Sequence, residues 1–359
     1  ILRQISEQAS RKADYIAPTD QIQVVTRDGN TNIVMEANKG MPTQQFVTNE
    51  VAFNQLASNC DLDVRTARRL RDNENYSREF DNLVNKILVN EPKNKMLRTF
   101  DGEQPLVRAI VSDKFKTFDN VDLVQAALPQ LLESDAQWQI VNGTITDQRL
   151  YMRLKSKNQI AEPAVGDLVS NGVMLRNSET GHGSCEVSQL IWTLACLNGM
   201  TSQNTSRHTH VTSARGTDEW SLLTNEAKEA DNVSLRLKLR DITASMADTA
   251  NFEKTVDQFR LAHGDIVENG LANPSAVVDS VVQVLKLPKK AASDVMAGLM
   301  QTIQQAGYTN KPVSRATLVN AVTSVAHVSH DDNVDEWYST GRQLLELPRN
   351  QWETIARAA

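Results

Sequence analysis

Cationic side chains and one tyrosine recur at every second position in the segment QRLYMRLKSK. The set consists of Arg149, Tyr151, Arg153, Lys155 and Lys157. A period of two, with apolar residues in between, predicts a β-strand with one apolar and one basic face. Such a face suits a single-stranded nucleic acid, because cations pair with phosphates and bases stack on the ring. A solvated sheet face, or an edge protected by cations against aggregation, would show the same pattern.

Other cations could extend this face into a nucleic-acid-binding groove. The candidates are Arg108, Lys114, Lys116, Arg176, Arg207 and Arg215. The run VRTARRLR is also basic, but its arginines spread around a helix, which is more typical of a solvated helix than of a phosphate-contacting one. The formal net charge is −6. An acidic total does not exclude a basic groove, because phosphates respond to the local field.

The segment RNSETGHGSCEVSQ places His182 three residues before Cys185. This spacing allows a nucleophile–base pair or part of a metal site. However, no CxxC or HxxxH pattern completes a metal site, and the GxSxG spacing of a hydrolase is absent. The alternative is a glycine-containing turn in which Ser184 caps an apolar helix, expected over LIWTLACLNGM. We therefore assign no catalytic residue, no cofactor and no metal, and expect the protein not to be an enzyme.

Periodicity and turn signals predict an α+β protein. We expect a central small antiparallel sheet with packed helices, a β-β-β-α-like core, and a mainly helical C-terminal part. The expected divisions are an N-terminal arm over 1–47, a core domain over 48–216 and a helical region over 217–359. Asp28-Gly29 and Asn142-Gly143 each stand between β-like residues, which is the signal for a tight hairpin turn.

Composition also indicates the compartment. The sequence has no apolar run of eighteen residues that would predict a membrane span, and its first residues lack the apolar stretch of a secretory signal. Three cysteines without regular spacing indicate reduced thiols rather than a disulfide framework. We therefore expect a cytoplasmic protein without a membrane contact.

Three segments carry a resemblance to a known family. They read RAIVSDKFKTFDNVDLV, VSNGVMLRNSETGHGSCEVSQLIWTLACLNGM and TLVNAVTSVAHV. They resemble the uncharacterised phage/plasmid-like family, which is encoded by prophages, plasmids and large phages, and the resemblance covers roughly residues 40–359. These motifs name no reaction. The order hairpin, strand, helix also resembles the core of the single-strand annealing proteins Redβ, RecT and ERF, which implies strand annealing by rings or filaments of subunits.

The basic strand and these resemblances together predict a non-enzymatic protein of a phage or mobile element. We expect it to bind or anneal single-stranded DNA, with RNA as the alternative, in the bacterial host cytosol as a homo-oligomer. Binding would use phosphate contacts and base stacking, so it would be salt-dependent and weakly sequence-specific. The alternative is a phage structural or host-interaction protein, such as a defence inhibitor, that binds no nucleic acid. The acidic net charge and the acidic, helical C-terminal part favour this alternative.

Overall fold

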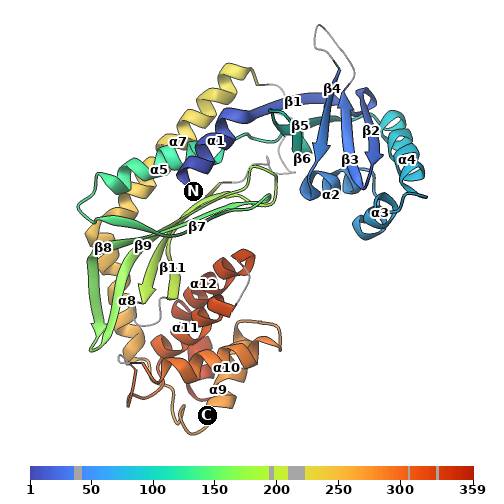
Figure 1. Cartoon of the computed structure of the whole chain (residues 1–359). Helices are drawn as coiled ribbons and strands as arrows, with labels where there is room; N and C mark the ends of the chain where they lie inside the picture. Colours follow the sequence, from blue (N-terminus) through green and yellow to red (C-terminus); the bar gives the residue numbers. More distant parts are fainter. Residues whose placement is uncertain (36–42, 194–197, 209–222, 306–307, 329–330) are drawn as a thin grey trace.

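The computed structural model describes residues 1–35, 43–193, 198–208, 223–305, 308–328 and 331–359. The chain forms an arc with one sheet near the N-terminus, a second sheet in the middle and a group of helices at the C-terminal end (Figure 1). The predicted α+β class and the mainly helical C-terminal part are confirmed. In the described part of the chain, no helix is long and apolar enough to cross a membrane.

The N-terminal sheet has six strands in the order β1-β5-β6-β4-β3-β2. They are β1 (Lys12–Pro18), β2 (Ile22–Arg27), β3 (Asn30–Met35), β4 (Gln44–Thr48), β5 (Asn94–Phe100) and β6 (Leu106–Ser112). Only β4 and β6 pair in parallel. The expected hairpin turn at Asp28-Gly29 is confirmed, and both residues have the positive φ, 50° and 74°, that this turn requires.

The expected division after residue 47 falls inside β4. Strands before it pair with strands after it, since β1 pairs with β5 and β4 with β6. The first residues are therefore part of a sheet and not a loose arm. Local sequence cannot show such pairing, because the partner strands lie at least 50 residues further along the chain.

Helices cover one face and one edge of this sheet. Helix α1 (Leu2–Arg11) precedes it, and α2 (Glu50–Asn59), α3 (Val64–Arg71) and α4 (Ser77–Asn90) form an apolar cluster with its strands. The Asn85 side chain on α4 accepts from the Val24 N–H at 2.7 Å and donates to the Val24 carbonyl at 2.9 Å. Because β2 is an edge strand, these bonds occupy backbone groups that another chain could otherwise pair with.

The central sheet is an antiparallel meander in the order β11-β10-β9-β8-β7. Its strands are β7 (Trp138–Ile145), β8 (Leu150–Ala164), β9 (Asp167–Asn177), β10 (Cys185–Thr193) and β11 (Asn198–His208). Helices α5 (Asn120–Leu132) and α7 (Asn225–Ala247) pack against one face of this sheet in a common apolar cluster.

Two local predictions in this region are wrong. Residues 190–193 of the segment expected as a capped apolar helix belong instead to the strand β10, whose residues Cys185–Thr193 are all buried. Residues 194–197 of that segment lie outside the described residues, and its last residues begin β11. A strand buried on both faces reads as a continuous apolar run, and periodicity cannot distinguish such a run from a buried helix. Asn142-Gly143 makes no turn: it lies within β7, just after a register shift between Ile140 and Asn142. The register shift is a bulge-like irregularity, and it allows the Asn-Gly pair to remain within the strand.

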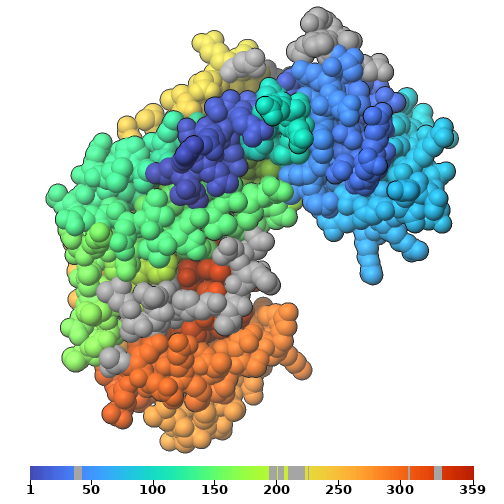
Figure 2. Space-filling view, viewed as in Figure 1, coloured from blue at the N-terminus to red at the C-terminus, as the bar shows by residue number. Residues whose placement is uncertain are grey.

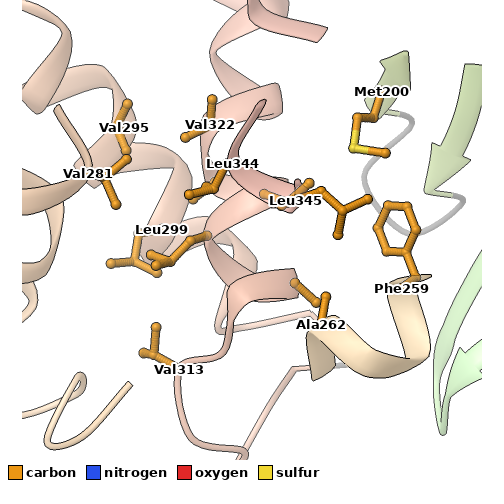
Figure 3. Close-up of a cluster of buried hydrophobic side chains, with 14 of the residues drawn as sticks. Met200, Phe259, Ala262, Val281, Val295, Leu299, Val313, Val322, Leu344 and Leu345 are labelled. Carbon is orange, nitrogen blue, oxygen red and sulfur yellow. The ribbon is translucent and has the colours of Figure 1, made fainter. Parts of the chain in front are cut away.

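The C-terminal helices pack around a core that also takes in one side of the central sheet. They are α8 (Thr249–Gly264), α9 (Pro274–Val284), α10 (Ala291–Thr302), α11 (Arg315–Ser324), α12 (Asp331–Leu345) and α13 (Arg349–Ala356), with the 3-10 turn η2 (Val325–Val328). The other 3-10 turn, η1 (Thr19–Gln21), connects β1 and β2 in the N-terminal sheet. Met200 of β11 lies beside Phe259 of α8 and Leu345 of α12 in this cluster (Figure 3). In the space-filling view, these helices and the N-terminal region lie at opposite ends of the central sheet (Figure 2).

Candidate nucleic-acid interface

The basic strand predicted from the sequence is β8, and its alternation is real. Leu150, Met152 and Leu154 are buried against α5 and α7. The opposite face was expected to meet solvent, and for two of its members this is wrong: Tyr151 is 1% and Arg153 3% exposed. For Arg153 the reason is α12, which packs over it. Nη2 of Arg153 donates to Oδ1 of Asp335 at 2.8 Å.

The remaining cations of β8 differ in exposure. Arg149 is half-buried, and its guanidinium donates to the His182 carbonyl and, at 3.0 Å, to the Tyr151 hydroxyl. It therefore anchors the loop that follows β9. Lys155 is half-buried and Lys157 is exposed. That these residues contact nucleic acid stays a prediction. Of the described side chains in the set, Lys155 and Lys157 are the ones that a nucleic acid could reach.

Arg108 and Arg176 also form buried or half-buried ion pairs. Arg108 is 5% exposed and its Nη1 pairs with Glu179. Nη2 of Arg176 donates to Glu186 at 2.5 Å, and Nη1 lies 3.6 Å from Asp335. Lys114 is half-buried in the turn after β6, and Arg215 lies outside the described residues.

Cationic side chains from three separate segments gather around one pocket, which we call the basic pocket. They are Lys116 after β6, Arg207 at the end of β11 and Lys238 on α7, and His208 lies next to Arg207 in the same lining. The pocket has a volume of about 330 Å³, and Phe118, Cys185, Asp231, Asn232 and Leu235 complete its lining. This cluster contains two of the residues predicted for binding, Lys116 and Arg207.

The charges in the basic pocket are close enough to affect one another. Burial lowers the pKa of His208, and the nearby charges of Lys238 and Lys116 lower it further. The ordinary pKa of histidine is about 6.5, and that of His208 is lower, so its imidazole is mostly neutral at pH 7. Lys116 pairs with Asp231 at 3.0 Å, and Nε of Arg207 donates to the Ser184 hydroxyl at 2.8 Å. The pocket thus keeps an excess of positive charge that suits phosphate.

A second cleft lies between the central sheet and the C-terminal helices. It has a volume of about 470 Å³, and its cations are Arg176, Arg207, Lys286 and Arg342. Glu186, Asp335 and Glu336 line the same cleft, so its charges nearly balance. Arg207 lines both this cleft and the basic pocket, because it stands on β11, the edge strand of the sheet.

The His182–Cys185 segment does not form an activated pair. Cys185 lies in β10, where burial first and the charges of Glu186 and Asp122 next raise the pKa of its thiol well above its usual range. The thiol therefore stays protonated. Nδ1 of His182 lies 3.1 Å from the Thr180 carbonyl. Among the described residues, no group of His, Cys, Asp and Glu side chains is placed to hold a metal ion.

Lys238 was missed by sequence reasoning. It lies on α7, 31 positions after Arg207, in an amphipathic helix whose other charges are mixed. His208 could be found, since it follows Arg207 in a segment that reads as a strand. Only the packing of α7 beside the end of β11 brings Lys238 to the pocket.

In the comparison with known proteins, a family model matches the central region of the chain. Residues 107–263 match the model of a family described as a domain of unknown function (DUF932). The match begins in β6 and ends in α8, so it includes the whole central sheet and every residue of the basic pocket. No curated protein and no solved structure matches the chain.

Proposed function

We propose that the protein binds single-stranded nucleic acid through the basic pocket. The observation that carries this proposal is the convergence of the cations Lys116, Arg207 and Lys238 on one pocket, from segments that are far apart in sequence. Side chains of one charge repel each other, so such convergence favours a site for an anion. Phosphates of a strand supply that anion at regular spacing.

Phosphate contacts, and not base stacking, dominate the proposed binding. Tyr151, the aromatic residue expected to stack on bases, is 1% exposed. Among the described residues that line the basic pocket, Phe118 is the aromatic residue, and it is buried. Affinity therefore depends mainly on counterion release, so it falls steeply with salt and varies little with sequence. The finer part of the proposal is strand annealing by an oligomer, encoded by a phage or other mobile element and acting in the host cytosol. The three segments similar to phage/plasmid-like proteins support the mobile-element origin. Annealing by an oligomer is supported only by the order of hairpin, strand and helix that resembles Redβ, RecT and ERF.

The first test is a fluorescence-anisotropy titration with a labelled single-stranded oligonucleotide at low and moderate salt. Arg207→Ala with Lys238→Ala removes two cations of the basic pocket, and Lys86→Ala removes an exposed cation of α4 as a matched control. The double variant should bind at least about tenfold more weakly at low salt. It should also lower the slope of log affinity against log salt by about 0.7 for each cation removed.

Each outcome of this titration decides something. Wild-type affinity in the double variant would rule out the basic pocket as the site. No salt-sensitive binding by the wild type at low salt would overturn the proposed function altogether. That result would favour the protein-binding alternative, which a pull-down from host lysate would then examine.

A further inference from the structure

A second, smaller pocket lies where the N-terminal sheet meets the central sheet, and we call it the junction pocket. Its volume is about 50 Å³. Gln8 of α1, Arg108 of β6 and Gln148 of the turn between β7 and β8 contribute to its lining. A few tens of Å³ hold a water cluster or one small ion, so a base or a peptide does not fit.

Arg108 is the group that points to a ligand. It is 5% exposed and its guanidinium lies over the Phe100 ring, 4.5 Å from the centroid. Nη1 is paired with Glu179, but Nε and Nη2 are buried and have no hydrogen-bond partner among the described residues. Leaving charged donors buried and unpaired is costly, so a bound acceptor would stabilise them.

The surroundings of Arg108 favour a negative charge. Asn49 is the N-cap of α2, Asn120 is the first residue of α5, and both line the junction pocket. Helix N-termini carry partial positive charge and suit oxyanions. Arg149 lies in the same wall.

Two carboxylates, Glu179 and Asp147, also line the junction pocket, and neither prevents an anion from binding there. Oε2 of Glu179 pairs with Arg108, and Oε1 accepts from the Asn120 N–H at 2.5 Å. Its charge is therefore already compensated. Asp147 is exposed to solvent, where its charge is screened. Arg108 and Glu179 offset each other's charge, so the field on an ion inside the pocket comes mainly from Arg149 and the two helix ends, while Arg108 contributes its unpaired donors Nε and Nη2.

We propose that the junction pocket binds a small oxyanion of phosphate size. Nε and Nη2 of Arg108 would donate to it, and the side-chain amides of Gln8 and Gln148 would complete its contacts. The recognised chemistry is a phosphate group, either free or at the end of a larger molecule that remains outside. This site is independent of the proposed nucleic-acid interface, since the basic pocket and the junction pocket have no lining residue in common.

The test is calorimetric titration and thermal unfolding of the full chain with inorganic phosphate, against chloride at equal ionic strength. Wild-type protein should show saturable binding and a saturable rise in melting temperature. Arg108→Gln should weaken phosphate binding about tenfold or more, and Gln148→Leu with Gln8→Leu about threefold or more. Lys238→Ala, in the basic pocket, should leave this binding unchanged.

The glutamine variants keep the experiment decisive if Arg108→Gln fails to fold, because both glutamines are only half-buried. No saturable response of the wild type to phosphate would overturn the proposal. So would a response that survives the glutamine changes but is lost in Lys238→Ala, because the ion would then occupy the basic pocket. A nucleoside monophosphate that binds more tightly than phosphate would support the site and identify the ligand as a larger molecule.

Discussion

The central sheet meets its two neighbours in different ways. Towards the N-terminal sheet the contact is ionic: Arg98 of β5, 0% exposed, pairs with Asp14 at 3.1 Å and Asp119 at 2.6 Å. Lys12 pairs with Asp119 at the rim, and Nη1 of Arg98 donates to the Glu179 carbonyl at 2.8 Å. With the pair of Arg108 and Glu179, these residues form what we call the junction cluster.

Towards the C-terminal helices the contact is mainly apolar, and the buried ion pair of Arg153 with Asp335 of α12 is set within it. Val169, Ile191 and Met200 of the sheet are buried in one cluster with Phe252 and Phe259 of α8 and with side chains of α11 and α12 (Figure 3). Apolar burial stabilises in proportion to area and has no preferred direction. Buried ion pairs fix orientation but require every partner, because an unpaired buried charge is costly. The two junctions should therefore respond differently to mutation and to pH.

The largest expected effect is at Arg98. Arg98→Met leaves Asp14 and Asp119 without their buried cation, and should lower the free energy of unfolding by about 3–5 kcal/mol. Urea unfolding followed by circular dichroism measures this change. Arg3→Met is the matched control, since its side chain is 92% exposed and its loss should change stability by no more than about 0.5 kcal/mol. Equal stability of the two variants would show that the junction cluster contributes little.

In the apolar cluster that extends from the other junction into the C-terminal helices, Leu344→Ala should lower the free energy of unfolding by about 2–5 kcal/mol through lost burial and a residual cavity. Leu344 is 0% exposed and lies among Val322 and Val295 in the core (Figure 3). Because no charge is removed, the loss should be the same at pH 7 and at pH 4 in parallel urea titrations. A loss that depends strongly on pH would contradict the apolar character of this junction.

Acid should weaken the ionic junction. Burial alone would raise the pKa of Asp119, but the charges of Arg98 and Lys12 outweigh burial and hold that pKa below its ordinary value. A carboxylate whose pKa is lower in the folded than in the unfolded protein stabilises the fold. This stabilisation is complete above the unfolded-state pKa of about 3.9 and is lost as the pH falls towards the folded-state pKa. Thermal unfolding should therefore show a falling melting temperature below about pH 4.

Asp119→Asn isolates this carboxylate, because asparagine is also a good helix N-cap and keeps the start of α5. The variant should be less stable than wild type at pH 7 and should lose less stability on acidification. If its melting temperature fell as steeply as that of the wild type, other carboxylates would be responsible for the acid sensitivity.

The smallest expected effect is at Lys12, on the rim of the junction cluster. Its side chain is 32% exposed, so solvent and salt screen its pairing with Asp119. Lys12→Met should lower stability by about 1 kcal/mol or less, and the difference should shrink further in 1 M salt. A loss as large as that of Arg98→Met would mean that the rim and the buried part of the cluster contribute equally.

Several features could be predicted from the sequence because they depend on neighbouring residues. Asp28-Gly29 specifies its hairpin through backbone conformations that few residues adopt. Asp63 caps α3, since its side chain accepts from the Thr66 N–H at 2.8 Å, and aspartate is a residue that favours this position. The alternation in β8 was also read correctly, and its apolar set does face α5 and α7.

Other features could not be predicted, because they depend on distant segments. The same alternation placed Arg153 on a face that only the docking of α12, some 180 residues later, converts from exposed to buried. For Cys185–Thr193, burial of both sheet faces removed the periodicity that separates strand from helix. Lys238 joined the basic pocket through the packing of α7 alone.

By itself, then, the amino-acid sequence determined the α+β class, the local turns and caps, and which residues are cationic, because these follow from each residue and its near neighbours. The tertiary structure alone decided which cations are available. It assigned Arg98, Arg108 and Arg153 to buried ion pairs, and left Arg207 and Lys238 at the surface of one pocket. The physical reason is that solvation and pairing of a charge depend on what packs over it, and that is set by contacts across the whole chain.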